Sequence, residues 1–315
     1  MSAGRTRLGD PADLEVYDDQ LVKEIMTPEF AESVCRNISD NTTYPWQHYH
    51  PSYEECGSKG TAHISVIDEY GIAAALTTTV NLPWGAHVHD THTGIILNSE
   101  MDDFSIPGQS NAFNLTPSIY NYIKPFKRPL SSMSPTIVSE MDGKPGLVIG
   151  ASGGSRIITA VIECIVKNYL WGYDLLDVVK SARVYHQLVP GVLYVEDGIS
   201  DKAIESLKEK GHIVQEFVEG PGAVSVVGAV RRGVDGKISA VADWWRKGGV
   251  SERRALPFFP PFSLLLICLF QPPSECAMTN RWACYSKLLG CEARLTAMNP
   301  KTDNATIVAP SVCER

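Results

Sequence analysis

Residues 61–81, TAHISVIDEYGIAAALTTTVN, contain the clearest folding pattern in the chain. From Thr61 to Ile67 small or polar residues alternate with apolar ones, and Ile72 to Asn81 forms a second run rich in β-branched residues. The segment between them, Asp68-Glu-Tyr-Gly71, has the composition of a turn. Residues 61–81 are therefore predicted to form a β-hairpin.

Further elements are expected on both sides of this hairpin. Before it, Glu15 to Cys35 has helix-compatible composition interrupted at Pro28, and Asn37 to Gly60 is a polar connector. The later strands are expected at Ile95–Asn98, Gly146–Gly150, Ala223–Arg231 and Ile238–Val241, and the later helices at Ser155–Leu170, Asp174–His186 and Lys202–Lys210. Helices and strands cluster in runs more than they alternate, which favours an α+β fold of layered sheets with helices outside.

Composition places the chain among ordinary globular proteins. The chain is 44% hydrophobic and 20% charged, a composition that excludes disorder throughout. Its 315 residues are enough for one large domain or two smaller ones. The formal charge is −8 and the pI is about 5.5. This charge disfavours nucleic acid or anionic lipid as a partner, and a small or zwitterionic substrate fits better.

The organisation changes near residue 250, where the folded unit that begins near Asp13 is expected to end. Ala255 to Phe270, ALPFFPPFSLLLICLF, is uncharged but shorter than the roughly 20 residues of a membrane span, and three prolines interrupt it. The residues after Phe270 have no sustained periodicity. Residues 255–315 contain five of the eight cysteines, without a C-x-x-C pair. We interpret residues 252–315 as an unrelated, disordered or mistranslated tail.

Gly60 and Thr61 form the first candidate site, at the junction of a flexible segment and a strand. A threonine in this position can be the nucleophile of an N-terminal nucleophile hydrolase, which cuts its own chain before the threonine and then uses the freed α-amine as base. Autocleavage requires attack of the threonine hydroxyl on the carbonyl of the preceding residue. Because Gly60 has no side chain, its carbonyl would be accessible to that attack. The alternative is structural, because threonine is a good strand former.

Three further candidates contain polar groups suited to a charged substrate. Residues 150–155, GASGGS, separate a strand from a helix, where backbone amides can stabilise an oxyanion or merely form a tight turn. Glu100-Met-Asp-Asp103 offers two carboxylates for an ammonium group or is a solvated acidic loop, and Ser131-Ser132 offers hydroxyls for a carboxylate or is ordinary loop.

His87, His89 and His92 are a separate candidate, as zinc ligands. A loop cluster of histidines without a defined scaffold is more often incidental, so we expect neither a metal nor a cofactor.

Five blocks of this chain, in the same order and spacing, closely resemble the small subunit of gamma-glutamyltransferase, also called gamma-glutamyltranspeptidase or glutathione hydrolase. The blocks are TAHISV at 61–66, TTTVNL at 77–82, GIILNSEMDDF at 94–104, PLSSMSPT at 129–136 and GASGG at 150–154. The resemblance covers about Asp13 to Ser251. It implies three segments: 1–60 as the end of the large subunit, 61–251 as the catalytic small subunit, and 252–315 outside the family.

The resemblance implies a four-layer αββα sandwich and autocleavage between Gly60 and Thr61. Thr61 would then be nucleophile and base, oriented by Thr79, and the amides of Gly153 and Gly154 would form the oxyanion hole.

The substrate residues also follow from the resemblance. Asn81, Glu100 and Asp103 would hold the α-ammonium group of the glutamyl moiety, and Ser131 and Ser132 would hold its α-carboxylate. The γ-glutamyl ester formed on the threonine from glutathione or another γ-glutamyl compound would be resolved by water, or by an amino-acid or dipeptide acceptor.

The implied protein partner is the large subunit of the same precursor. Most of it would lie outside this chain, together with an arginine that pairs with the substrate carboxylate, which suggests a truncated or misassembled gene model and an incomplete sandwich. Family members enter the secretory pathway and reach the plasma membrane or vacuole, although Met1 to Asp10 contains no apolar signal segment. The alternative function is an inactive fragment or pseudoenzyme that acts at most as a binding partner.

Overall fold

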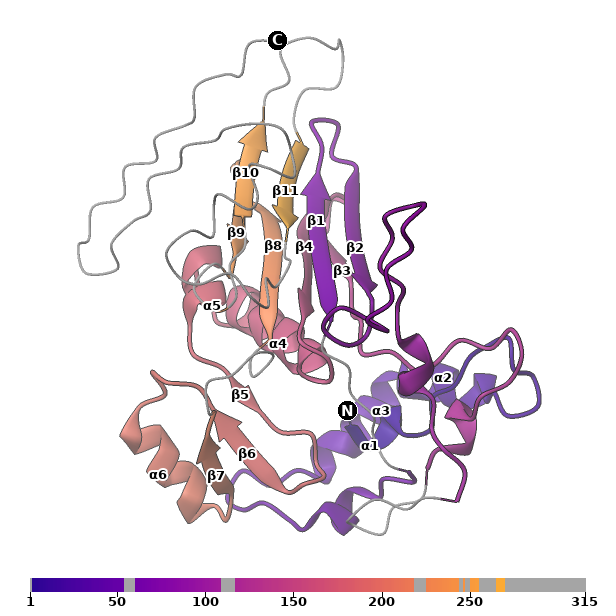
Figure 1. The fold of residues 1–315 in the computed structure, drawn as a ribbon. Coiled ribbons are helices and arrows are strands. Elements are labelled where there is room, and N and C mark those ends of the chain that lie inside the picture. The colour runs from indigo at the N-terminus through magenta and orange to yellow at the C-terminus, as the bar shows by residue number, and fades with distance from the viewer. Residues whose placement is uncertain are drawn as a thin grey trace. The chain divides into compact units, whose positions relative to one another are not determined.

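The computed structural model describes residues 2–53, 60–108, 117–217, 225–243, 246, 250–254 and 265–269, the last two ranges as backbone strands. The chain divides into two compact units, Met1–Pro272 and Pro273–Arg315, and every described residue belongs to the first. Figure 1 shows how the helices and strands of this unit are arranged.

The predicted hairpin is confirmed as β1 (Thr61–Ile67) and β2 (Ala73–Thr79), which pair antiparallel with Thr61 opposite Thr79. Gly71 in the connecting turn has φ +82°, a left-handed conformation that favours glycine. Side chains along β1 are alternately buried and half-buried, beginning with a buried Thr61. The buried face of β1 therefore carries the polar residues Thr61, His63 and Ser65 together with Ile67, which is the opposite of what the apolar alternation alone would predict.

A four-stranded antiparallel sheet packs against this hairpin (Figure 1). Its strands in spatial order are β3 (Thr136–Ser139), β4 (Pro145–Ser152), β8 (Val226–Arg232) and β9 (Ile238–Ala242). Side chains on one face, including Val148 and Val230, pack with Ile67 of β1. Side chains on the other face, including Leu147 and Ile149, pack with helices. This central sheet therefore has a core on both faces.

Helices cover the second face of the central sheet. α4 (Arg156–Ile165) continues into a π-helical turn, η4 (Val166–Leu170), and is followed by α5 (Leu175–Lys180). The buried residues of α4 recur at helical spacing: Ile157, Ala160, Val161 and Cys164. The expected helix at 155–170 is thus confirmed, with a change of helix type near its end.

The helix expected from Asp174 to His186 is shorter than predicted. Asp174 does cap it, since its side chain accepts a hydrogen bond from the Leu176 amide at 2.9 Å. The helix ends at Lys180 because Ser181 adopts an extended backbone and the chain then enters a strand.

A smaller three-stranded sheet follows. It contains β5 (Val184–Tyr185), β6 (Val192–Val195) and β7 (Ile213–Glu216), with β5–β6 antiparallel and β6–β7 parallel. α6 (Asp201–Glu209) is the crossover between the two parallel strands, as such pairs require. The helix expected at 202–210 is therefore confirmed to within one residue at each end.

The N-terminal segment and the loops contain the remaining helical elements. They are α1 (Ser2–Arg5), α2 (Asp19–Ile25), α3 (Pro28–Arg36), and the 3₁₀ turns η1 (Trp46–Tyr49), η2 (Glu100–Asp103) and η3 (Ile119–Asn121). The predicted interruption at Pro28 is confirmed, because Thr27 caps α3 and proline occupies its first turn.

Three strand predictions need correction. Ile95–Asn98 is not a strand, and its only ladder contact among the described residues is an isolated bridge between His89 and Ile96. β2 ends at Thr79, before the expected Asn81, because Asn81 turns the chain with φ +71°. β8 begins at Val226, and the start of the expected strand at Ala223 lies outside the described residues.

Part of the segment beyond Ser251 is described. β10 (Val250–Arg254) pairs antiparallel with β11 (Leu265–Leu269). The rest of 252–315 lies outside the described residues, so its interpretation as an unrelated tail stays a prediction. Within the described ranges, none of the helices combines the length and apolar character needed to cross a membrane.

The α+β class predicted from sequence is confirmed. From one side to the other the described residues form the β1–β2 hairpin, the central sheet and the α4–α5 layer, which are the β, β and α layers of the expected sandwich. Leu76 and Thr78 lie on the outward face of β2 and are exposed.

Candidate active site

Thr61 occupies the first position of β1, directly after a glycine that the backbone requires. A Cβ built on Gly60 would lie 2.4 Å from the carbonyl oxygen of Leu82 and 2.8 Å from that of Asn81. Since both contacts are to backbone atoms, no side-chain motion relieves them. Gly60 therefore lets the chain enter β1 against the 81–82 segment, with the Thr61 side chain only 3% exposed.

The Thr79 hydroxyl connects three neighbouring groups. It accepts hydrogen bonds from Thr61 Oγ1 at 3.2 Å and from the Asn81 amide at 2.8 Å, and it donates to the Gly60 carbonyl at 3.0 Å. A hydroxyl has one hydrogen and two lone pairs, so these bonds use its full capacity. The Gly60 carbonyl also accepts a hydrogen bond from the Val80 amide at 3.0 Å. The carbonyl oxygen of the Gly60–Thr61 peptide bond therefore has two hydrogen-bond donors.

Asn81 joins the hairpin to the acidic turn η2. Its left-handed backbone turns the side chain so that Nδ2 donates to the Ser99 carbonyl at 2.8 Å. The Ser99 amide in turn donates to the Val80 carbonyl at 3.0 Å. Asn81 Oδ1 and Glu100 Oε1 are buried acceptors for which the described residues supply no donor. Two acceptors without donors therefore lie on neighbouring segments.

Glu100 and Asp103 begin and end η2, and one 3₁₀ turn places them on the same side. Burial raises the pKa of Glu100 to about 7, and the negative charge of Asp103 and its hydrogen bond to Glu100 contribute. Burial also raises the pKa of Asp103, while the hydrogen bond from Glu100 and the charge of Arg5 oppose that rise. The pair is thus a partly buried acidic site that a cation would stabilise.

Ser131 and Ser132 differ in burial. Ser132 is buried and its hydroxyl oxygen accepts a hydrogen bond from Arg5 Nη2 at 2.8 Å, whereas Ser131 is exposed and its hydroxyl accepts from the Met133 amide at 3.1 Å. Asn121 ties this loop to the acidic turn: its Nδ2 donates to the Asp103 carbonyl at 2.7 Å and its Oδ1 accepts from the Leu130 amide at 2.8 Å. The acidic turn and the serines therefore share one site.

Gly153 and Gly154 form the turn between β4 and α4, with φ of +127° and +65°. The packing of the sheets indicates where this turn lies. A Cβ on Gly150 would be 2.2 Å from the His63 ring, so β1 crosses β4 closely at these residues. Further along β1, Ile67 packs with Val148. His63 is two residues after Thr61 and Gly150 is three residues before Gly153, so the contact between His63 and Gly150 brings the start of β1 near the glycine turn.

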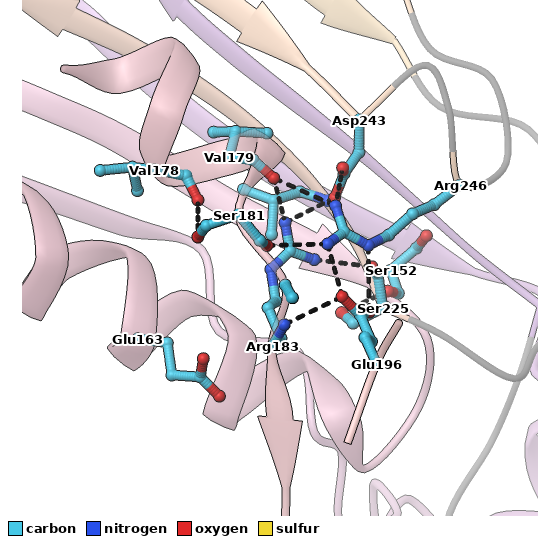
Figure 2. Close-up of polar contacts among 12 residues, drawn as sticks. Ser152, Glu163, Val178, Val179, Ser181, Arg183, Glu196, Ser225, Asp243 and Arg246 are labelled. Atoms are coloured by element: carbon cyan, nitrogen blue, oxygen red, sulfur yellow. Dashed lines mark hydrogen bonds and ion pairs between the residues drawn. The ribbon is translucent and has the colours of Figure 1, made fainter. Parts of the chain in front are cut away.

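A buried ion-pair network anchors the same end of β4 (Figure 2). Arg183 donates to Asp243 Oδ2 at 2.7 Å and to the Ser225 carbonyl at 2.8 Å, and Ser225 Oγ donates to the Ser152 carbonyl at 2.8 Å. Arg246 pairs with Asp243 and also donates to the carboxylate of Glu196. Because Ser152 immediately precedes Gly153, the network restrains the backbone at the start of the turn.

The three histidines of the loop cluster do not come together as a set of metal ligands in the described structure. No three His, Cys, Asp or Glu side chains gather as metal ligands anywhere in the part of the chain that the structure describes, which includes His87, His89 and His92. The zinc hypothesis is therefore not supported.

Several residues that position the site were not predicted from the sequence. They are Arg5, Asn121, Arg183, Ser225, Asp243 and Arg246. Most of their partners lie far away in sequence, although Arg246 also pairs with Asp243 three residues before it. No local sequence pattern distinguishes a charged residue that becomes buried from one that stays exposed.

Comparisons with known proteins agree with this geometry. The family model described as gamma-glutamyltranspeptidase matches residues 1–252. The chain is 46% identical over 232 residues to glutathione hydrolase proenzyme 2 of Schizosaccharomyces pombe, a match that covers 74% of this chain and 38% of that protein. It is 44% identical over 214 residues to proenzyme 1 of the same organism, covering 68% and 34%.

A solved structure also matches. The gamma-glutamyltranspeptidase of Pseudomonas nitroreducens, complexed with L-DON, aligns with a TM-score of 0.53 at 35% identity, over 61% of this chain and 98% of that chain. The chain spans well under half the length of the curated relatives that it matches. Since the family model covers most of the chain and the fold agrees with a solved member, this chain belongs to the gamma-glutamyltranspeptidase family of N-terminal nucleophile hydrolases.

Proposed function

We propose that this chain carries the nucleophile and most of the substrate site of a glutathione hydrolase, or gamma-glutamyltransferase. It would cleave the γ-glutamyl bond of glutathione and related compounds and pass the γ-glutamyl group to water or to an amino-acid or dipeptide acceptor. Thr61 would be the nucleophile after autocleavage of the Gly60–Thr61 bond. The observation that carries the proposal is the buried Thr61 hydroxyl bonded to Thr79, beside a Gly60 carbonyl that accepts two hydrogen bonds.

Autocleavage would begin with attack of Thr61 Oγ1 on the Gly60 carbonyl carbon. The hydroxyl proton points toward Thr79, which leaves an oxygen lone pair for the attack. Negative charge then develops on the Gly60 oxygen, which accepts hydrogen bonds from the Thr79 hydroxyl and the Val80 amide. The Gly60–Thr61 C–N bond breaks, its nitrogen takes the proton that the Thr61 hydroxyl gives up and becomes the α-amine, and an ester joins Gly60 to Thr61 Oγ1. Water hydrolyses this ester, leaving two chains.

Turnover would repeat the same chemistry on the substrate. The Thr61 α-amine takes the proton of its own hydroxyl, Oγ1 attacks the γ-carbonyl carbon, and the amine leaving group departs with a proton. Water or an acceptor amine then attacks the γ-glutamyl ester and restores Thr61. Thr79 would hold the nucleophile in place through its 3.2 Å hydrogen bond.

The charged groups match the two ends of a γ-glutamyl substrate. Asn81, Glu100 and Asp103 would hold its α-ammonium group, and the two acceptors without donors on Asn81 and Glu100 support this role. The raised pKa of Glu100 is consistent with a carboxyl group that awaits a cation. Ser131 and Ser132 would donate to the α-carboxylate.

The tetrahedral intermediate needs donors for its oxyanion, and the Gly153 and Gly154 amides would supply them. Both glycines have positive φ, a conformation in which successive amides can point to one side, and the turn opens α4, whose N-terminal amides favour negative charge. The close approach of His63 on β1 to Gly150 on β4 supports their placement near Thr61.

The remaining parts of the proposal concern partners and place. The large-subunit region of the same precursor would complete the site, since the chain spans 38% of one curated relative. A secretory, plasma-membrane or vacuolar location follows the family. Glutathione itself is a small anionic peptide, and no nucleic-acid partner is proposed for a chain of formal charge −8.

The proposal is tested on the purified full chain, alone and with the large-subunit region of a relative supplied in trans. Mass spectrometry should find a fragment that begins at Thr61, and γ-glutamyl-p-nitroanilide should release p-nitroaniline. Thr61→Ala should abolish both, while Thr78→Ala, on the exposed face of the partner strand, should affect neither. Silence of the assembled complex would refute the enzyme and favour an inactive fragment.

A further inference from the structure

Arg5 is a buried cation within the candidate site that no motif predicts. It ends the short helix α1, is 6% exposed, and lies 127 residues before its partner Ser132. Burying a guanidinium group is unfavourable unless it is paired and hydrogen-bonded. The partners of Arg5 therefore indicate what its burial serves.

Those partners belong to the two ends proposed for the substrate. Arg5 Nη2 donates to Ser132 Oγ at 2.8 Å, on the side assigned to the α-carboxylate. Its charge also acts on Asp103, on the side assigned to the α-ammonium group, and lowers the pKa of that carboxyl group against the effect of burial. Arg5 is thus electrostatically linked to both ends at once.

The direction of the Arg5–Ser132 hydrogen bond determines what Ser132 can do. A guanidinium group only donates, so the Ser132 oxygen must accept. The Ser132 hydrogen is then directed to another acceptor, as binding a carboxylate requires. The positive charge 2.8 Å from that oxygen also favours an anion beside it.

Arg5 is held in place by contacts other than the one to Ser132. The next residue, Thr6, accepts at its carbonyl from Ser118 Oγ at 3.2 Å. Asp10 accepts from the Arg128 amide at 2.7 Å and from its Nη2 at 2.6 Å, and Lys127 pairs with Asp13 at 2.6 Å. These bonds fix the segment 2–13 against 118–128. Changing the Arg5 side chain therefore removes its polar contacts without releasing the segment.

We propose that Arg5 is a positioning residue for γ-glutamyl recognition, which orients the Ser132 hydroxyl toward the α-carboxylate and balances the charge of Asp103. This inference rests on the function proposed above. It predicts that Arg5 acts mainly on binding of the α-carboxylate end and little on the chemical step.

The first test compares two donors on the assembled protein: γ-glutamyl-p-nitroanilide and its analogue with an α-carboxamide in place of the α-carboxylate. Arg5→Met should raise KM for the carboxylate donor by about tenfold to 100-fold, with little change in kcat and little change in KM for the carboxamide. Arg5→Lys keeps the charge and should recover part of the loss. Equal effects on both donors, or no effect on either, would overturn the inference.

The second test does not depend on turnover. L-glutamate and 4-aminobutyrate, which lacks the α-carboxylate, are titrated calorimetrically into the full chain. Wild type should prefer glutamate, and Arg5→Met should reduce that preference about tenfold or more. Arg128→Gln serves as the matched control, because it perturbs the anchoring contact with Asp10 and should keep the preference.

The outcomes separate this inference from the proposed function. Glutamate binding that depends on Arg5, together with an assembled complex that shows no turnover, would refute the enzyme activity and support the Arg5 role. Glutamate binding that is equal in wild type and Arg5→Met, or no glutamate binding by wild type, would overturn the Arg5 role. If Arg5→Met does not fold, as judged by its unfolding midpoint, Arg5→Lys decides: a partly reduced preference for glutamate supports the inference, and an unchanged preference or a loss equal for both ligands opposes it.

Discussion

Replacing Thr79 by valine removes the hydroxyl at the centre of the candidate active site while keeping the shape of the side chain. The change deletes three hydrogen bonds, of 3.2, 3.0 and 2.8 Å. At about 0.5–1.5 kcal/mol net for each, the free energy of unfolding should fall by roughly 1.5–4.5 kcal/mol. The upper half of that range is expected because the amide of the buried Asn81 loses its acceptor.

The same hydroxyl is one of two donors to the Gly60 carbonyl oxygen, which would become negative during autocleavage. Losing one such donor slows acyl transfer by about 10²–10³-fold, so we expect self-cleavage to slow by about 100-fold or more. The assay follows the fragment that begins at Thr61 by mass spectrometry after synthesis. Urea unfolding of the uncleaved chain measures stability separately.

Two control variants define the result. Thr79→Ser keeps the hydroxyl and should cleave within about tenfold of wild type. Thr78→Val makes the same chemical change on the exposed face of β2 and should alter neither quantity. The assigned role of Thr79 would be refuted if Thr79→Val cleaved itself at the wild-type rate while Thr61→Ala, prepared in the same way, remained uncleaved.

Four other predictions concern the core and the charges. Gly150→Ala would place a Cβ 2.2 Å from the fully buried His63 ring, so it should destabilise the fold by about 1–3 kcal/mol in urea unfolding. Burial lowers the pKa of His63 from 6.5 to about 4, so the folded state resists protonation of this ring more than the unfolded state does. The free energy of unfolding should therefore be highest above pH 6.5 and fall by up to about 3 kcal/mol as the pH drops from 6.5 to about 4. His63→Asn should make the free energy of unfolding less dependent on pH in this range. Arg183→Met leaves Asp243 with less compensation and should cost about 3–5 kcal/mol, seen as a lower melting temperature, whereas an unchanged one would contradict the buried pairing. Because the pKa of Glu100 is raised to about 7, KM for a γ-glutamyl donor should fall as the pH rises through 7, and Glu100→Gln should lose that dependence.

Much of the fold could be predicted because its signals are local. The alternation in 61–67, the turn before Ile72 and the helical spacing of apolar residues in α4 each depend on residues a few positions apart. The predictions failed where distant partners override such signals. The segment from Asp174 was expected to stay helical to His186, but Val184 and Tyr185 pair with β6 instead. Ile95–Asn98 has strand-like composition but only one isolated bridge.

The candidate site shows the same division. Thr61 could be selected from its place after a glycine at the start of a strand, whereas Thr79 and Asn81 were implied by the family resemblance; the hairpin register in the structure places Thr61 opposite Thr79. The acidic turn and the serines could be selected by residue type. Their common location could not be inferred from local pattern, because it depends on Asn121 and Arg5, which join segments up to 127 residues apart.

The sequence alone determined the hairpin, the glycine before Thr61, the acidic turn and the glycine turn after β4, since each depends on backbone preferences and neighbouring side chains. Tertiary structure alone decided that Arg5 reaches Ser132, that Arg183 and Arg246 converge on Asp243, and that a histidine is buried against Gly150. The physical reason is that burial and pairing of charges are properties of the packed chain. The residue type does not show whether an arginine is buried or exposed, and only the fold decides which arginines are desolvated.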